Sequence, residues 1–129
     1  MVKVLVVDDE PAYRDSLRLL MPCEGFEVET AANEREALDV SQRFAPDVLV
    51  VDWMLKDHTD GLDIAQGLRQ RHPKMQVILI TGYPTANLEA RIRSLPATQL
   101  LTKPFTLSRL IGSIYAAVQV APSACDRAS

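Results

Sequence analysis

The sequence contains little cysteine and no long apolar run. Cys23 and Cys125 are its two cysteines, and neither lies in a Cys-x-x-Cys motif or in a Cys/His cluster with zinc spacing. We therefore expect two unpaired thiols in a reducing compartment. Apolar runs such as Val4–Val7 have four residues, far fewer than the roughly 20 that span a bilayer. No signal peptide is apparent before the acidic residues that begin at Asp8, so the sequence predicts a soluble cytoplasmic domain without membrane contact.

Length and charge narrow the class of protein further. A chain of 129 residues fits one domain, and 47% hydrophobic residues are too many for a disordered chain. The net charge of −3 argues against direct nucleic-acid binding by this chain, because phosphate binding needs a dominant basic face. Residues 1–63 carry 15 acidic and 6 basic residues, whereas residues 64–129 carry 2 acidic and 8 basic ones. This division is compatible with an acidic site in the first half and a basic docking surface in the second.

Short β-branched runs alternate with longer segments of helical periodicity. The expected strands are 3–7, 26–30, 48–51, 77–80 and 99–101. The expected helices run from Pro11 to Met21, from Asn33 to before Pro46, from Gly61 to near His72, between Pro84 and Leu95, and from Thr106 or Ser108 to Val118. This alternation predicts an α/β fold, a parallel sheet with helices on both faces. We expect one domain over 1–120 and a flexible C-terminal tail over 121–129.

Polar residues follow four of the expected strands. They are Asp8 and Asp9 after the first strand, Asp52 after the third, Thr81 after the fourth and Lys103 after the fifth. Right-handed crossovers bring the carboxyl ends of parallel strands to one edge of the sheet, where ligands bind in such folds. Three carboxylates at one edge favour a cation, and oxygen ligands suit Mg²⁺. A carboxylate can also act as a nucleophile toward phosphorus, with the hydroxyl and the ammonium binding phosphoryl oxygens.

Each of these residues also has an ordinary structural interpretation. The acidic residues 8–10 are typical of a helix N-terminus, and Asp52 is typical of a capped loop. Thr81-Gly82 is typical of a turn, and Lys103-Pro104 of a solvated loop. Chance placement of these residue types at four different strand ends is the weaker explanation, so we interpret them as one site.

The motifs that carry these residues resemble a known family, the receiver (CheY-like) domain of two-component response regulators. The resemblance covers about residues 3–120 and rests on four ordered segments: Val7-Asp8-Asp9-Glu10, Val50-Val51-Asp52-Trp53-Met54, Ile80-Thr81-Gly82-Tyr83 and Leu101-Thr102-Lys103-Pro104-Phe105. It implies a flavodoxin-like (βα)5 three-layer sandwich with a five-stranded parallel sheet in the order 2-1-3-4-5.

The resemblance implies a role for each matching residue. Asp52 corresponds to the phosphoacceptor, which takes a phosphoryl group from a sensor histidine kinase, a phosphotransfer protein or a small phosphodonor. Asp9 and Asp52 correspond to direct Mg²⁺ ligands, Asp8 to a ligand through water, and Met54 to a ligand through its backbone carbonyl. A domain of this kind catalyses only its own phosphorylation and dephosphorylation.

Two further residues correspond to the family's phosphoryl sensors. Thr81 is expected to hydrogen-bond the phosphoryl group, and Lys103 to pair with one of its oxygens before a cis peptide bond to Pro104. Their movement would switch the surface formed by the fourth helix, the fifth strand and the fifth helix. We expect that surface to dock an output domain, an effector protein or a second copy of the chain, with Arg91, Arg93 and Arg109 as its basic candidates.

The sequence departs from the family pattern at two places, position 100 and the loop after Asp52, where Lys56 stands in place of the family's usual proline. Leu100 stands where the family usually has a switch aromatic, three residues before the lysine. Gly61 comes nine residues after Asp52 instead of eight, which suggests one inserted loop residue, and we interpret the inserted segment as a turn and a helix cap with an exposed His58. Bulky side chains, Met54 and Tyr83, occupy the family's rate-tuning positions, and we expect them to hinder attack by water.

Other functions fit the residues less well. A Mg²⁺-dependent aspartate-nucleophile phosphohydrolase is the alternative, but it needs Asp-x-Asp, whereas here Asp52 is followed by Trp53-Met54. A flavin-binding module would need a Ser/Thr/Gly-rich phosphate loop after the first strand, and no Walker lysine motif is present. The chain fits both a stand-alone regulator and the receiver part of a longer protein.

Overall fold

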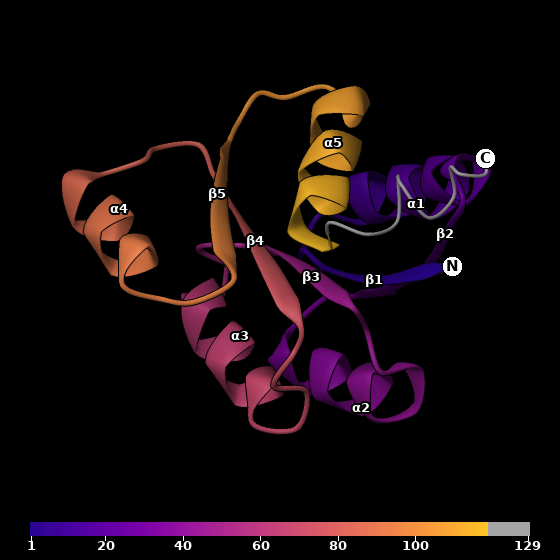
Figure 1. The fold of residues 1–129 in the computed structure, drawn as a ribbon, viewed down its shortest axis with the longest axis horizontal. Helices are drawn as coiled ribbons and strands as arrows, with labels where there is room; N and C mark the ends of the chain where they lie inside the picture. The colour runs from indigo at the N-terminus through magenta and orange to yellow at the C-terminus, as the bar shows by residue number, and fades with distance from the viewer. Residues whose placement is uncertain (119–129) are drawn as a thin grey trace.

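The computed structural model describes residues 1–118, which form five strands and six helices (Figure 1). The strands are β1 (Val2–Val7), β2 (Phe26–Ala31), β3 (Val48–Asp52), β4 (Gln76–Thr81) and β5 (Thr98–Thr102). The α-helices are α1 (Pro11–Leu20), α2 (Glu34–Phe44), α3 (Gly61–Arg69), α4 (Ala86–Arg93) and α5 (Leu107–Val118), with a short 3₁₀ helix η1 (Met21–Glu24) after α1. The expected tail at 121–129 and Cys125 lie outside the described residues.

All neighbouring strands pair in parallel, in the order β2-β1-β3-β4-β5. This is the predicted strand order, and the fold is the predicted flavodoxin-like α/β fold. The register places Asp52 opposite Ile80 and Thr81 opposite Thr102, so the ends of the three strands β3, β4 and β5 lie level with one another. One edge of the sheet therefore carries the loops that follow every strand.

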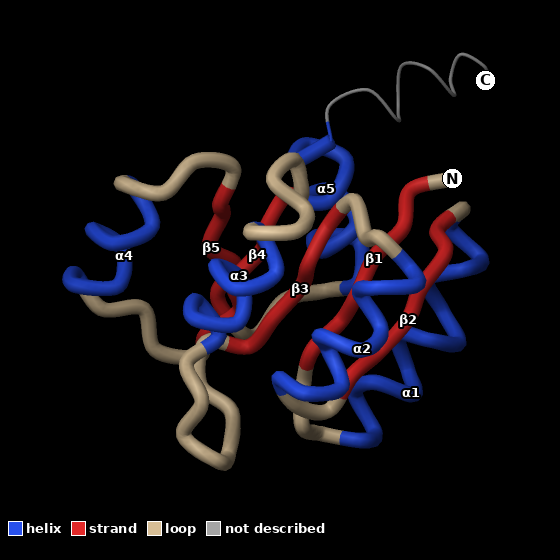
Figure 2. Tube along the Cα trace, turned by 90° about the horizontal axis from the view of Figure 1, so that it is seen from below, coloured by secondary structure: helices blue, strands red, loops and turns tan. Residues whose placement is uncertain are grey.

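Two apolar layers lie between the sheet and its helices. Leu5 and Val7 of β1 belong to a buried cluster that includes residues of α2, α3 and α4, whereas Val4 and Val6 belong to a second cluster with residues of α1 and α5. Strand side chains alternate between faces, so a strand buried on both sides must be apolar at every position. The views in Figures 1 and 2 show the same division, with α1 and α5 on one face of the sheet and α2 and α3 on the other.

The helices begin and end where individual residues favour or prevent backbone hydrogen bonds. The side chain of Asn33 accepts a hydrogen bond from the backbone N–H of Glu36, as expected for the N-cap of α2. Asp60 caps α3 in the same way through the N–H of Leu62. The prediction that the first helix continues to Met21 is wrong in detail: Pro22 has no backbone N–H to donate, so α1 ends at Leu20 and the chain tightens into η1 before Gly25 at φ 91°.

Two negative findings hold for the described residues. No helix within residues 1–118 has both the length and the apolar character needed to cross a membrane. Cys23 is exposed and forms no disulfide with a described residue.

Candidate functional site

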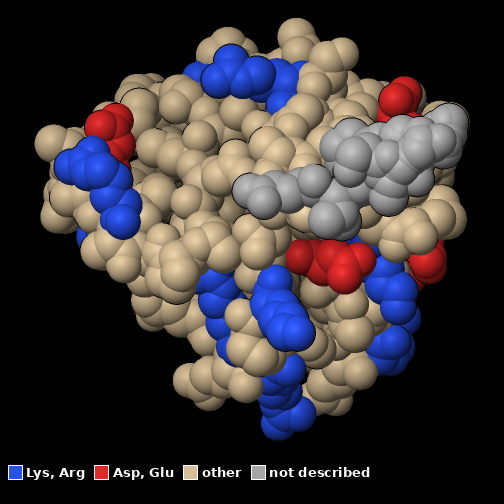
Figure 3. All heavy atoms as spheres, viewed as in Figure 1, with Lys and Arg blue, Asp and Glu red and all other residues tan. Residues whose placement is uncertain are grey.

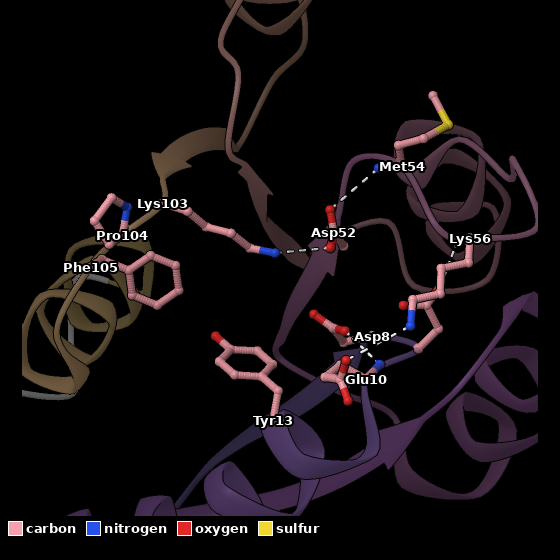
Figure 4. Close-up of a pocket in the computed structure, with 10 residues that line it drawn as sticks. Asp8, Glu10, Tyr13, Asp52, Met54, Lys56, Lys103, Pro104 and Phe105 are labelled. Atoms are coloured by element: carbon pink, nitrogen blue, oxygen red, sulfur yellow. Dashed lines mark hydrogen bonds and ion pairs between the residues drawn. The ribbon is translucent and has the colours of Figure 1, made fainter.

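A pocket of about 540 Å³ opens at the carboxyl edge of the sheet. Its walls come from the loop after β1 and the start of α1, from the end of β3 and the loop beyond it, and from the loop after β5 (Figure 4). The residues that line it are Asp8, Asp9, Glu10, Tyr13, Asp52, Met54, Lys56, Lys103, Pro104 and Phe105. The pocket thus contains the predicted carboxylates and the predicted lysine, drawn from three separate strand ends.

Asp52 lies at the centre of the pocket. Its Oδ2 atom is 3.2 Å from Nζ of Lys103, and its Oδ1 atom lies 3.4 Å from the backbone N–H of Met54 (Figure 4). The Asp52 side chain is 18% exposed and that of Lys103 is 43% exposed. One carboxylate is therefore accessible to a small molecule and already faces a cation. The Lys103–Pro104 peptide bond is cis, as expected.

Asp8 is the most buried of the three carboxylates, with 4% of its surface exposed. Its Oδ1 atom accepts a hydrogen bond from the backbone N–H of Glu10 at 2.9 Å. Burial raises the pKa of Asp8 above its usual range; the Glu10 N–H opposes the shift, and the charge of Asp52 adds to it. A carboxylate with a raised pKa gains from a nearby cation, because a cation stabilises its charged form.

Asp9 contacts the loop after β3. Its Oδ2 atom accepts a hydrogen bond from the backbone N–H of Lys56, and Nζ of Lys56 lies 3.8 Å from a carboxylate oxygen of Glu10. The β1–α1 loop and the β3–α3 loop are thereby connected across the mouth of the pocket. Position 56 therefore fixes the wall of the site through its backbone, a role that its side chain does not reveal.

The β3–α3 loop forms a compact turn that projects beyond the sheet edge (Figure 2). The N–H of Leu55 donates to the carbonyl of Thr59, and the intervening His58 is exposed with a left-handed φ of 67°. The expected turn, helix cap and exposed His58 are confirmed. At the end of the loop, the N–H of Gly61 donates to the carbonyl of Trp53 at 2.6 Å, and a Cβ atom at position 61 would overlap the carbonyl oxygen of Asp52. Only glycine allows this approach.

Thr81 lies at the end of β4 but does not line the pocket. It is 4% exposed, and its hydroxyl oxygen accepts a hydrogen bond from the backbone N–H of Tyr83 at 3.1 Å. The expectation that all five polar residues share one cavity therefore holds for the carboxylates and Lys103 and is wrong for Thr81 in this state. The hydroxyl closes the turn after β4, so it must turn away from Tyr83 to reach the pocket.

The three carboxylates are ligands of the type that a hard cation prefers, but their side chains do not converge on one point. Among residues 1–118, no three His, Cys, Asp or Glu side chains converge closely enough to hold a metal ion. Asp9 is held by the Lys56 backbone and Asp52 by Lys103. An all-oxygen set that lines one cavity nevertheless matches the ligands that Mg²⁺ prefers.

Several lining residues were not singled out as site residues from the sequence. From the sequence, Tyr13 has no assigned role, and Glu10 is an acidic residue typical of a helix N-terminus. Lys56 was noted only as a departure from the family pattern. Tyr13 lies in the first turn of α1, which begins at Pro11, two residues after Asp9. This closeness in the chain to Asp8 and Asp9 of the β1–α1 loop was the available signal.

The surface expected to switch includes position 100 and three basic candidates. Leu100 is partly buried and packs against the buried cluster between the sheet and α2, α3 and α4. Arg91 of α4 lies 3.4 Å from Oδ2 of Asp60, whereas Arg93 and Arg109 are exposed. Figure 3 shows basic side chains in separate groups on the face that it presents, not in one patch.

Known proteins are similar to this chain in sequence and in fold. The family model of the response regulator receiver domain matches residues 4–115. The probable transcriptional regulatory protein TcrX of Mycobacterium tuberculosis is 37% identical over 112 residues, which cover 85% of this chain and 47% of that protein. The response regulator MprA of Mycolicibacterium vanbaalenii is 34% identical over 115 residues, 89% of this chain and 49% of that protein. Chemotaxis protein CheY4 of Vibrio cholerae superimposes with a TM-score of 0.82 at 28% identity, covering 91% of this chain and 98% of that one.

The chain therefore belongs to the response regulator receiver domain family. It is a receiver domain of two-component signal transduction, and this membership does not favour the phosphohydrolase alternative. The chain spans about half the length of the curated relatives TcrX and MprA that it matches.

Proposed function

We propose that Asp52 accepts a phosphoryl group and that the chain switches its surface in response. The observation that carries the proposal is the pocket itself. It presents one accessible carboxylate at the end of β3, with the Lys103 ammonium 3.2 Å away and the two carboxylates Asp8 and Asp9 in the same cavity. The phosphoryl donor would be a sensor histidine kinase, a phosphotransfer protein or a small acyl phosphate.

The transfer is a substitution at phosphorus. An oxygen of Asp52 forms a bond to phosphorus as the bond between phosphorus and the donor's nitrogen or oxygen breaks, and the leaving group keeps that electron pair. Negative charge spreads over the phosphoryl oxygens during the transfer. Lys103 is positioned to stabilise it, because its ammonium already contacts the acceptor carboxylate. Water later reverses the modification, so the chain acts catalytically only on itself.

Asp9 and Asp52 would hold Mg²⁺ directly, Asp8 through water and Met54 through its backbone carbonyl. When bound, Mg²⁺ supplies positive charge beside the phosphoryl oxygens. The raised pKa of Asp8, which is buried, supports the proposal, since such a carboxylate is stabilised by a cation. The Lys56 N–H orients Asp9 toward the cavity from the opposite wall.

The phosphoryl group would be sensed by Thr81 and Lys103, which lie at the ends of the adjacent strands β4 and β5. Thr81 would exchange its contact with the Tyr83 N–H for a phosphoryl oxygen. The surface of α4, β5 and α5 would then dock an output domain, an effector or a second copy of the chain. Because position 100 holds leucine, an aromatic rotation at this position is unavailable for the coupling.

We place the receiver domain at residues 1–120, in the cytoplasm, where sensor kinases present their phosphohistidine. The test of this proposal is incubation of the purified chain with acetyl phosphate, with and without Mg²⁺, followed by intact-protein mass spectrometry. One added phosphoryl group in the presence of Mg²⁺, absent in Asp52→Asn, is the expected result. Turnover of an unrelated phosphate ester without a modified protein would support the phosphohydrolase alternative instead.

A further inference from the structure

The hydroxyl group of Tyr13 is buried in the wall of the pocket without a protein partner. Its oxygen is inaccessible, and no residue within the described part of the chain hydrogen-bonds to it. The ring packs against the apolar cluster between the sheet and helices α1 and α5. A buried hydroxyl without a partner is costly, and in most proteins such groups are satisfied. This one therefore requires an explanation.

The surroundings of the hydroxyl indicate which partner it suits. Tyr13 lines the same cavity as Asp52 and Lys103, and Figure 4 shows its hydroxyl pointing from α1 into the space beside Lys103 and Phe105. Burial raises the pKa of the Tyr13 phenol, and the negative charges of Asp8 and Asp52 raise it further. The hydroxyl is consequently a neutral donor at physiological pH, in a cavity where the protein offers it no acceptor.

We propose that the Tyr13 hydroxyl donates a hydrogen bond to an oxygen of the phosphoryl group on Asp52. This inference rests on the function proposed above. It adds Tyr13 to Lys103 and Thr81 as a third side chain that contacts the phosphoryl group. A phosphoryl group brings three strong acceptor oxygens into the cavity. Lys103 contacts Asp52 from the end of β5, whereas Tyr13 lines the cavity from α1. The two donors therefore come from different walls of the pocket.

A neutral donor differs from a second lysine in its effect. It binds an anion when one is present without neutralising the carboxylates that attract a cation. The hydroxyl therefore distinguishes the phosphorylated pocket from the unmodified one. Loss of one hydrogen bond to a charged group typically weakens binding by about tenfold or more. Loss of the Tyr13 hydroxyl should weaken binding of the anion and leave binding of the cation unchanged.

The test uses Tyr13→Phe, which removes one oxygen and keeps the ring. The probe is beryllium fluoride with Mg²⁺, a stable mimic of a phosphoryl group on a carboxylate. Trp53 is the single tryptophan and follows Asp52 directly, so its fluorescence reports on occupancy of the site. Tyr115→Phe is the matched control, because the Tyr115 hydroxyl donates to the carbonyl of Glu24, far from the pocket.

We expect Tyr13→Phe to raise the half-saturating beryllium fluoride concentration by about tenfold and to leave the Mg²⁺ half-saturation within about twofold. Tyr115→Phe should change neither. Equal beryllium fluoride affinity in wild type and Tyr13→Phe would overturn the inference, as would a parallel loss of Mg²⁺ and beryllium fluoride binding, which indicates a distorted pocket. If instead wild type binds no beryllium fluoride, or Asp52→Asn binds it equally well, the proposed function itself fails.

Discussion

Nζ of Lys103 lies 3.2 Å from Oδ2 of Asp52, although 51 positions separate the two residues in sequence. The contact joins the ends of β3 and β5 across the intervening strand β4. It also gives Lys103 two opposing effects on the site. The ammonium competes with any cation for the Asp52 carboxylate, and it stabilises negative charge when a phosphoryl group arrives.

Replacing Lys103 should separate these two effects. In Lys103→Met, we expect Mg²⁺ to bind several-fold more tightly, because a competing positive charge is gone, and phosphorylation by acetyl phosphate to slow by about 100-fold. Trp53 fluorescence measures the first effect and the time course of intact mass the second. Lys56→Met is the control, since that side chain also lines the pocket but pairs with Glu10. Equal losses of phosphorylation rate in the two variants would contradict a specific role for Lys103.

Gly61 should tolerate no side chain. A Cβ atom there overlaps the backbone of Asp52, so Gly61→Ala must displace the end of β3 or the start of α3. We expect a loss of about 2 kcal/mol in the free energy of unfolding and weaker Mg²⁺ binding. Gly67→Ala lies in the same helix with open space around the added carbon, and it should stabilise the protein by about 0.5 kcal/mol. Urea unfolding of both variants makes the comparison. Similar unfolding midpoints for Gly61→Ala and wild type would contradict the packing argument.

The two bulky residues near the site should differ in their effect on hydrolysis. Met54 lines the pocket, whereas Tyr83 is 84% exposed and lies outside its lining. We expect Met54→Asn to shorten the lifetime of the phosphorylated protein by about threefold or more, because a smaller polar side chain admits and orients water. Tyr83→Ala alone should change it little. Decay of radiolabelled protein measures both lifetimes, and slower decay in Met54→Asn would refute the steric explanation.

The buried carboxylate of Asp8 should make stability depend on pH in the metal-free protein. Its folded-state pKa is raised above 3.8, so the folded state binds its proton more tightly than the unfolded state does. The stability of the folded state that comes from protonated Asp8 is fully present below about pH 3.8, and it is lost as pH rises through the folded-state pKa. The asparagine of Asp8→Asn does not ionise, so this variant should have a higher free energy of unfolding than wild type at pH 7 in EDTA. The difference in free energy should shrink as the pH falls. Urea unfolding from pH 4 to 8 provides the measurement, and an advantage that grows toward low pH would contradict the sign.

The alternation of strands and helices and the position of the site were predictable from the sequence because both depend on patterns that extend over several residues. Apolar strands such as Val48–Val51 and amphipathic helices alternate, and parallel strands then place Asp8, Asp52 and Lys103 at one edge. The order 2-1-3-4-5 itself came from the resemblance to the receiver family. Strand ends were shifted by one residue, because pairing with a neighbouring strand extends an element beyond its apolar run.

Other features of the site depend on contacts that no sequence pattern records. The hydrogen bond from the Lys56 backbone to Asp9 uses an N–H that every residue except proline possesses, so position 56 carries no signature of it. Thr81 was expected in the pocket, but its hydroxyl closes a turn with Tyr83. Tyr13 has helical spacing typical of a core residue, and its exceptional feature is one oxygen atom that the fold leaves without a partner.

The site of phosphorylation is the central claim, and chemical trapping tests it most directly. Borohydride reduces an aspartyl phosphate to homoserine, which marks the modified residue permanently for peptide sequencing by tandem mass spectrometry. After treatment with acetyl phosphate and Mg²⁺, we predict homoserine at position 52 and unmodified aspartate at positions 8 and 9. Homoserine at another aspartate, or no homoserine in a fully folded protein, would contradict the account.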